Sequence, residues 1–215
     1  MGIANLTVLA GLAWVAAPLA AQELLVPGGP YEASAVPADA RGEWLALVAD
    51  GADRLAAVRV SLVSVTEECT GAPGAARVVR VAGRPEPAVL FRHVPGTRAG
   101  PVTAGTLTPA DDWRRPREGQ FAGRPFLLRE ERVGEGFRLR YAWGPTLETV
   151  FETEVEDEGH WELLWLGDLN RDGWPDLLLQ ADGKYSLQTT RLLLSRLRNG
   201  VGVLEEVAAF RIAAC

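Results

Sequence analysis

The second half of the chain is a series of short runs, apolar or alternating between apolar and polar residues, separated by turn residues. Seven runs follow one another after residue 123: RPFLLREERV, GFRLRYAWG, LETVFETEV, HWELLWLG, PDLLLQA, TTRLLLSRL and GVLEEVAAFRI. The joints between them are rich in turn residues, as in GEG, GP, EDEG and RDG. Short strands at regular spacing with frequent turn signals are typical of all-β proteins. This half therefore predicts an antiparallel meander of short strands.

Two joints and one run allow finer predictions. Asp182-Gly183 and Asn199-Gly200 suit two-residue hairpin turns, which need residues that tolerate positive φ. The segment TTRLLLSRLRNG could instead form a short helix capped by Gly200. We favour a strand because Thr189 and Thr190 open the segment and because it is short.

The first half of the chain carries similar signals around a proline-rich middle. EWLALVAD and the alternating run RLAAVRVSLVSVTEEC are separated by GA, which predicts a hairpin. Seven prolines lie between Arg84 and Pro125, and they exclude a long helix because each removes a backbone donor. We expect short strands such as AVLFRHV and loops in this middle, and an irregular lead-in over VPGGPYEASAVPADARG. The predicted fold class is all-β or β-dominated.

One joint, GDLNRDGWPDLLL, places oxygen donors at alternate positions. The donors are four side chains and one backbone carbonyl: Asp168, Asn170, Asp172, Asp176 and the carbonyl of Trp174. Gly173 permits the sharp bend that would bring them together. Calcium takes about six to eight oxygen ligands, and three carboxylates with an amide are hard ligands that suit it better than zinc or copper. Magnesium fits less well because it prefers a tight octahedron and keeps its waters.

The flanks of this joint exclude an EF-hand. The twelfth position would be a bidentate Glu in an EF-hand, and it is Leu179 here. The neighbouring runs ELLWLG and PDLLLQA have strand character, and Pro175 lies inside the loop. We therefore expect the loop to join two strands, with Asp176 closing a calcium site.

GDLNRDGWPDLLL resembles the calcium loop of FG-GAP and VCBS repeats, the units of integrin α-type β-propellers, with the pattern G-D-x-[ND]-x-D-G-x-x-D-[LI]. The resemblance covers about 13 residues, or about 30 with the following QADGKYSLQTTRLLLSR. It implies that the same four side chains and carbonyl bind a structural calcium ion. That family joins several copies into a closed propeller, whereas this chain has one copy, so we do not expect a propeller. The whole chain also resembles small exported bacterial proteins of unknown role with one such loop and a terminal Cys.

The alternative for this loop is an acidic β-turn without an ion. Three carboxylates packed together without a cation would repel one another and raise each other's pKa, which disfavours that alternative. At the affinity of extracellular modules, about 10⁻⁴–10⁻³ M, 1 mM calcium adds roughly 0.4–1.4 kcal/mol to the free energy of unfolding. The ion is therefore expected to order a surface loop, and not to fold the chain.

The first 21 residues contain no Asp, Glu, Lys or Arg and end in Leu19-Ala20-Ala21. This is the layout of a secretory signal peptide cleaved after Ala20 or Ala21, although no basic residue precedes its apolar core. An uncleaved membrane anchor is the alternative, because the run comes close to spanning a bilayer. With cleavage, no stable membrane span is expected, and the localisation is periplasmic or extracellular.

Cys69 and Cys215 are the only cysteines of the chain. In an exported protein they are most simply a disulfide, which would close a loop of 147 residues. Chain entropy limits the contribution of such a bridge to roughly 5 kcal/mol. Two free thiols are the alternative, since the sequence does not show whether the two Cα atoms approach.

Other candidate sites are weaker. EVEDEGHWE, around His160, is interpreted as an exposed acidic turn, because zinc needs three or four ligands and the chain has two His. His160 lies eight residues before the calcium loop, which allows it to lie near that site. Asp111 and Asp112 are adjacent, which is more typical of a turn or a helix cap than of paired glycosidase carboxylates. No catalytic residue is predicted.

Tryptophans offer a further structural prediction. Trp161 and Trp165 are an even number of residues apart, so they are expected on one face of a strand. Most tryptophans are expected in the core. Trp174, inside the loop, is the best candidate for an exposed ring that contacts a partner or a sugar.

The sequence predicts a signal peptide over residues 1–21 and one β-rich domain over 22–215, with a hairpin region at 43–69, a proline-rich middle at 84–125 and the calcium-loop meander at 126–215. The net charge of −6 argues against a nucleic-acid partner. We expect an exported calcium-binding module, binding or structural, with an unknown protein or glycan partner. The alternative is an extracytoplasmic hydrolase of an envelope or extracellular polymer. The lack of a recognisable catalytic motif favours the module.

Overall fold

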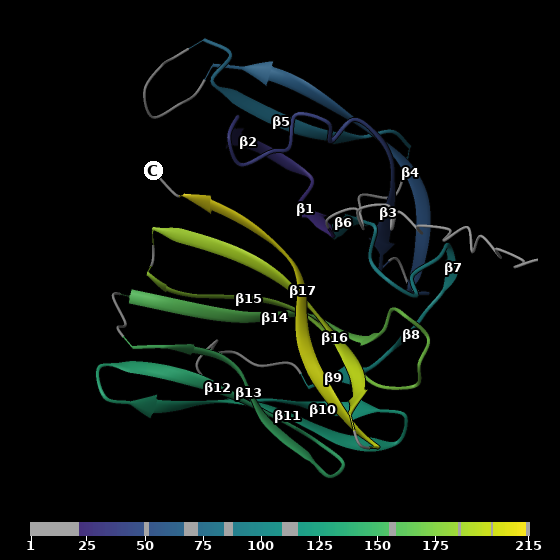
Figure 1. Cartoon of the computed structure of the whole chain (residues 1–215), viewed down its shortest axis with the longest axis vertical. Helices are drawn as coiled ribbons and strands as arrows, with labels where there is room; N and C mark the ends of the chain where they lie inside the picture. Colours follow the sequence, from purple (N-terminus) through teal and green to yellow (C-terminus); the bar gives the residue numbers. More distant parts are fainter. Residues whose placement is uncertain are drawn as a thin grey trace, which may run out of the picture.

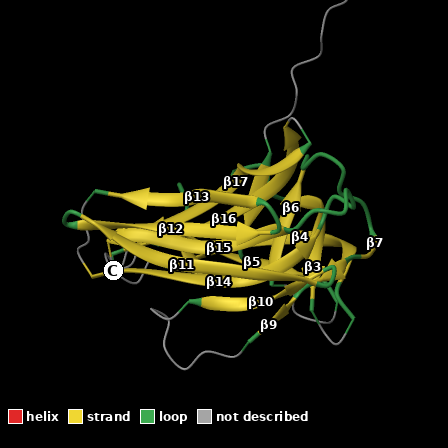
Figure 2. Ribbon diagram, turned by 90° about the horizontal axis from the view of Figure 1, so that it is seen from below, coloured by secondary structure: helices red, strands yellow, loops and turns green. Residues whose placement is uncertain are grey.

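The computed structural model describes residues 22–49, 52–66, 73–83, 88–108, 116–154, 158–184, 186–198 and 200–213. The predicted signal peptide, the two cysteines and the Asp111-Asp112 pair lie outside these ranges, so the predictions made for them stay predictions. Every described element is a β-strand, as Figure 2 shows, and this confirms the all-β fold class. The described segments accordingly include no apolar helix of the length that crosses a membrane.

The first half of the chain forms the N-terminal sheet. Its strand order is β1-β6-β3-β4-β5-β2, with β7 paired to β4. The bounds are β1 Glu23–Leu25, β2 Gly28–Glu32, β3 Gly42–Val48, β4 Arg54–Val65, β5 Ala76–Val81, β6 Val89–Arg92 and β7 Gly100–Pro101. The predicted hairpin is confirmed as β3 and β4, which pair antiparallel from Gly42↔Val60 to Val48↔Arg54.

The rest of the chain forms two five-stranded antiparallel sheets. The meander sheet has the order β13-β12-β11-β10-β9, and the central sheet has the order β17-β16-β15-β14-β8. The bounds in the meander sheet are β9 Thr106–Leu107, β10 Arg117–Phe121, β11 Arg124–Val133, β12 Gly136–Trp143 and β13 Thr146–Thr153. Those in the central sheet are β8 Thr103–Ala104, β14 Glu158–Asp168, β15 Asp176–Lys184, β16 Leu187–Arg198 and β17 Val201–Ala213.

The finer predictions had mixed outcomes. The segment opened by Thr189 is strand β16 and not a helix. Of the predicted Asn199-Gly200 turn, Asn199 lies outside the described residues, and Gly200 has a φ of 79°. The turn at Asp182-Gly183 is wrong, because both residues belong to β15. The Asp182 carboxylate there accepts hydrogen bonds from the backbone N–H and the hydroxyl of Thr189 on β16, which holds the strands together beyond the expected turn. The lead-in is not wholly irregular either, since it contains β2.

The three sheets form layers, with the central sheet in the middle (Figure 1). One face of the central sheet packs on the N-terminal sheet, where Leu178 and Leu192 share a buried cluster with Trp44 and Phe91. Its other face packs on the meander sheet through a second cluster, which includes Trp161 and the partners Leu128 and Phe137 from β11 and β12. Because both faces of β15 are covered, its sequence is a continuous apolar run rather than an alternating one.

A β-bulge in β14 overturns the prediction that Trp161 and Trp165 share a face. The register with β15 runs Trp161↔Ala181 and Leu163↔Leu179 but then Trp165↔Leu178, so Leu164 is the extra residue. A bulge inverts the side-chain alternation that follows it. Trp161 therefore faces the meander sheet, and Trp165 faces the N-terminal sheet.

The central and meander sheets curl around the second cluster as an open half-barrel (Figures 1 and 2). At one seam the chain itself passes from β8 to β9 through Gly105, whose N–H donates to the Leu166 carbonyl at 2.8 Å. A Cβ at Gly105 would lie 2.6 Å from Leu166 Cδ2, so the crossing needs glycine. At the other seam, side chains of β13 bond the edge of β17: Glu148 Oε1 accepts the Leu204 N–H at 2.8 Å, and the Thr146 hydroxyl donates to the Gly202 carbonyl at 3.2 Å.

Candidate metal centre

The five predicted donors lie in the 168–176 loop, which joins β14 to β15 in the central sheet. The loop therefore connects two strands, as the sequence predicted. Gly173, at φ 86°, makes the expected bend, and Arg171 also has a left-handed backbone at φ 61°. Two left-handed residues so close together fold the loop back on itself, which places Asp168 and Asp176 at the facing ends of paired strands.

Asp168 organises the middle of the loop. Its side chain is buried, and its two carboxylate oxygens accept the backbone N–H groups of Asp172 at 3.0 Å and Gly173 at 2.9 Å. Each carboxylate oxygen has more than one lone pair, so accepting one N–H does not exhaust it. Asp168 is therefore both a fastener of the turn and an available oxygen donor.

Asp176 closes the loop against two strands. It is 0% exposed. Its Oδ2 accepts the Leu169 N–H at 2.7 Å, and its Oδ1 accepts the N–H and the hydroxyl of Ser195 on β16 at 2.8 and 3.1 Å. Burial is the largest cause that raises the pKa of Asp176, to about 7; the N–H groups of Ser195 and Leu169 oppose the rise, and the charges of Asp172 and Asp168 add to it within that value.

Asp172 and Asn170 form the exposed side of the loop. Asp172 Oδ1 accepts the Trp174 N–H at 2.8 Å, and Asp172 Oδ2 accepts from Asn170 Nδ2 at 2.9 Å. The Ser195 hydroxyl lies 3.4 Å from both oxygens of Asp172 and 3.1 Å from Asp176 Oδ1. The Ser195 hydroxyl thus lies between the carboxylate in the middle of the loop and the carboxylate at its end.

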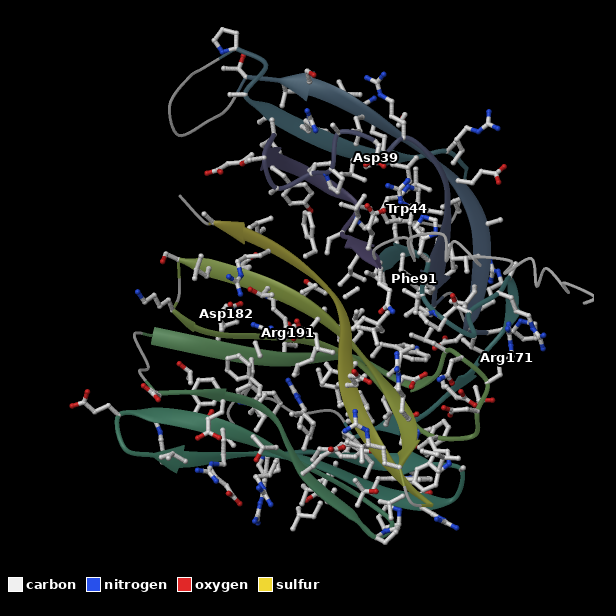
Figure 3. All side chains as sticks on the ribbon, in the orientation of Figure 1. Asp39, Trp44, Phe91, Arg171, Asp182 and Arg191 are labelled. Atoms are coloured by element: carbon white, nitrogen blue, oxygen red, sulfur yellow. The ribbon has the colours of Figure 1, made fainter. Side chains whose placement is uncertain are left out.

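The negative charge of the loop has no basic partner. Within the described ranges, no ion pair joins Asp168, Asp172 or Asp176 to an arginine, lysine or histidine. Arg171 is the basic residue of the loop itself, but its guanidinium donates to the carbonyls of Arg98 and Pro101 (labelled Arg171 in Figure 3). His, Cys, Asp and Glu side chains of the described segments form no ready group of three around a metal position. The oxygens of the loop are instead turned to backbone N–H groups.

Trp174 does not present the exposed ring that the sequence suggested. Its ring packs edge-on against Trp143 of β12, with 5.1 Å between centroids, and it joins the edge of the second buried cluster. A Cβ at Gly202 of β17 would overlap the Trp174 ring, so the ring fills the place of a side chain there.

His160 lies away from the loop. It pairs with Asp182, whereas the loop begins after the pair Gly167↔Asp176 at the opposite end of the β14–β15 hairpin. Eight residues of extended strand separate His160 from Asp168, about 26 Å at roughly 3.3 Å per residue. Residues 155–157 of the predicted acidic turn lie outside the described ranges. The described residues of this segment therefore provide no catalytic geometry for the hydrolase alternative.

Two residues of the site were not predicted. Ser195 reaches the carboxylates because β16 lies beside β15, and only the strand pairing reveals this. Arg171 bonds carbonyls some 70 residues earlier in the chain, and nothing in the sequence indicated these partners. Compared with known proteins, the chain matches no protein-family model, no curated protein and no solved structure.

Proposed function

We propose that this chain is an exported calcium-binding β-protein that acts as a binding or structural module. The calcium donors would be Asp168, Asn170, Asp172, Asp176 and the carbonyl of Trp174. The observation that carries this proposal is the set of three aspartates closed into one loop with no basic partner in the described chain, one of them fully buried.

The donor set fits calcium by its chemistry. Burying a carboxylate is costly unless the charge is paired, and hydrogen bonds from backbone N–H groups offset only part of that cost. Hard oxygen ligands with a large negative charge favour a divalent cation that accepts irregular geometry. A bound calcium ion would supply the missing positive charge. The resemblance to FG-GAP and VCBS loops supports the same five donors.

The residues of the chain prepare this site in different ways. Gly173 and Arg171 provide the left-handed turns, and Ser195 with Leu169 fixes the Asp176 carboxylate. Asp172 and Asn170 are held only by bonds within the loop and to the Ser195 hydroxyl, so they can turn toward an ion at small cost. The ion would be structural, because it would replace repulsion between carboxylates and bring no reacting group with it.

The wider role follows from the signal-like N-terminus and the fold. An all-β exported protein that holds calcium in a strand-connecting loop is suited to recognising a protein or a glycan, with the ion keeping the contact region rigid. The periplasm and the cell exterior are the compartments proposed for it.

Isothermal titration of the metal-free protein with calcium tests the proposal. We expect one site with a Kd of about 10⁻⁴–10⁻³ M, and weaker binding of magnesium. Asp172→Asn should weaken calcium binding at least tenfold, while Asp182→Asn, on the same sheet but away from the loop, should leave it unchanged. The absence of a calcium signal in the wild-type protein would leave the acidic β-turn as the correct description of the loop.

A further inference from the structure

The 168–176 loop contacts all three sheets, and two of these contacts are made by side chains that lie between its donor side chains. Leu169 is fully buried in the cluster between the central and N-terminal sheets. Arg171 bonds carbonyls of the segment that leads through β7, and Trp174 packs on Trp143 of the meander sheet. Leu169 and Arg171 are therefore two anchors that alternate with the donor side chains, whereas Trp174 carries both a packed ring and a proposed donor carbonyl.

The contact with the N-terminal sheet is specific. Arg171 Nη2 donates to the Arg98 carbonyl at 2.9 Å and to the Pro101 carbonyl at 3.1 Å, and Arg171 Nε donates to Pro101 at 3.2 Å. Pro101 belongs to β7, which pairs with the beginning of β4 through Arg54↔Pro101 and Leu55↔Gly100. The guanidinium thus ties the loop to an edge of the N-terminal sheet.

Two neighbouring contacts also hold the loop close to the N-terminal sheet. A Cβ at Gly96 would lie 3.0 Å from Asn170 Cβ, so the turn after β6 rests directly on a donor residue of the loop. Just before the loop, Trp165 Nε1 donates to Asp53 Oδ2 at 2.6 Å, next to the first residue of β4. Two further links therefore join the β14 end of the loop to the N-terminal sheet.

We propose, resting on the calcium site above, that this loop is a calcium-dependent joint that couples ion binding to the docking of the N-terminal sheet on the half-barrel. The donors and the anchors alternate on one short backbone, so a change in the donor positions moves the anchors. Without the ion, repulsion among Asp168, Asp172 and Asp176 acts directly on the backbone that carries Leu169 and Arg171. With the ion, both anchors are fixed.

Hydrogen exchange of the intact protein, read by mass spectrometry in 10 mM calcium and in EGTA, tests this coupling. Openings that release the ion become rarer by the factor 1 + [Ca]/Kd, roughly 10- to 100-fold at the affinity of extracellular modules. We expect this rise in protection in the loop and also in β3, β4 and β7. The β11–β12 hairpin around Gly136, at the end of β12 away from Trp143, should rise less.

The Arg171→Ala variant tests the coupling to the N-terminal sheet separately from calcium binding. Compared with the wild-type protein at equal calcium saturation, it should keep the calcium-induced protection of the loop but lose that in β3, β4 and β7. Arg196→Ala is the matched control, because Arg196 forms an ion pair with Glu205 at the β16–β17 end and should change neither.

The outcomes distinguish the two proposals. Calcium binding with added protection confined to the loop and Ser195 would overturn the joint alone, even if the Arg171 variant failed to fold. Full retention of the calcium effect in Arg171→Ala would also overturn it. No calcium binding to the wild-type protein would remove the proposed function and the joint together.

Discussion

Two buried aspartates lie on the same strand, and they differ in their surroundings. Asp176 at the start of β15 and Asp182 near its end each accept the N–H and the hydroxyl of one residue on β16, Ser195 for the first and Thr189 for the second. Figure 3 labels Asp182 at one end of the central sheet and Arg171, which belongs to the same 168–176 loop as Asp176, at the other. At both ends of β15, an aspartate carboxylate thus links β15 to β16 by the same pair of hydrogen bonds.

The difference between the two ends is charge. Around Asp182 a basic group belongs to the hydrogen-bond network, since Arg211 Nε donates to the Thr189 hydroxyl at 3.2 Å. Around Asp176 the neighbours are Asp168 and Asp172, and the loop's own arginine is turned to backbone carbonyls. A buried aspartate alone is therefore explained as a link between two strands, whereas the excess of carboxylates, with no basic partner among the described residues, is what supports the proposed metal site.

The largest expected effect is that of Asp176→Ala. It leaves the N–H groups of Leu169 and Ser195 without their acceptor, at about 1–3 kcal/mol each, so we expect a loss of roughly 2–6 kcal/mol in the free energy of unfolding. Calcium binding should disappear as well. Urea unfolding in EGTA and a calcium titration measure the two losses. A variant that unfolds within 1 kcal/mol of the wild-type protein would show that Asp176 does not fasten the loop.

Asp182→Ala should come next and should affect stability alone. The N–H of the fully buried Thr189 loses its acceptor, which predicts a loss of about 1–3 kcal/mol in urea unfolding. Calcium affinity should stay within twofold of the wild-type value, because the loop is at the other end of β15. A tenfold loss of calcium affinity in this variant would contradict the separation of the two ends.

Asp172→Asn should show the reverse pattern. Asp172 is exposed, so the metal-free protein should unfold within about 0.5 kcal/mol of the wild-type protein, as most surface substitutions do. Calcium affinity should fall at least about tenfold, since the number of charged ligands sets affinity in such loops. Unfolding in EGTA and calorimetry decide this. Undiminished affinity would mean that Asp172 is not a ligand.

The smallest expected effect concerns Glu148, a third carboxylate that links two strands by a hydrogen bond. Glu148 accepts the Leu204 N–H at the open seam, and burial raises the pKa of Glu148 while that N–H opposes the rise. The folded protein then holds the Glu148 proton more tightly than the unfolded chain does. The stability attributable to this group should be present at low pH and be lost as pH rises through the range above about 4.5.

Glu148→Gln measures that contribution, because glutamine keeps an acceptor for Leu204 and does not titrate. Urea midpoints of the wild-type protein and the variant between about pH 4 and 6.5 should diverge as pH rises, with the variant losing less stability. Parallel curves would show that the carboxyl at this seam has an ordinary pKa.

The fold was largely predictable where local signals agree. The alternation in β4 and the prolines between Arg84 and Pro125 predicted a strand and short segments that the described residues contain. These signals are local, because periodicity and turn chemistry act within a few residues. The lead-in was harder, since β2 depends on pairing with β5, more than 40 residues away.

The errors came from effects that a single run of sequence does not carry. The bulge at Leu164 places Trp165 on the opposite face of β14 from Trp161. The Asp-Gly pair at Asp182 indicated a turn, but Asp182 lies in β15 and its carboxylate bonds Thr189 of the neighbouring strand β16. In the 168–176 loop, the five candidate donors were proposed from spacing, and they stay a proposal. Ser195 and the partners of Arg171 required the three-dimensional arrangement, because nothing in the sequence reports which distant segment lies beside the loop.

Thermal unfolding of the protein with and without calcium tests the central claim most directly. With a Kd of about 10⁻⁴–10⁻³ M, 10 mM calcium stabilises the folded state by roughly 1.4–2.7 kcal/mol relative to EGTA, or about 3–10 °C in Tm for a chain of this length. The same concentration of magnesium should give a clearly smaller shift, and a tenfold loss of affinity in Asp172→Asn should reduce the calcium shift to about half or less. Identical melting temperatures of the wild-type protein in calcium and in EGTA would contradict the account.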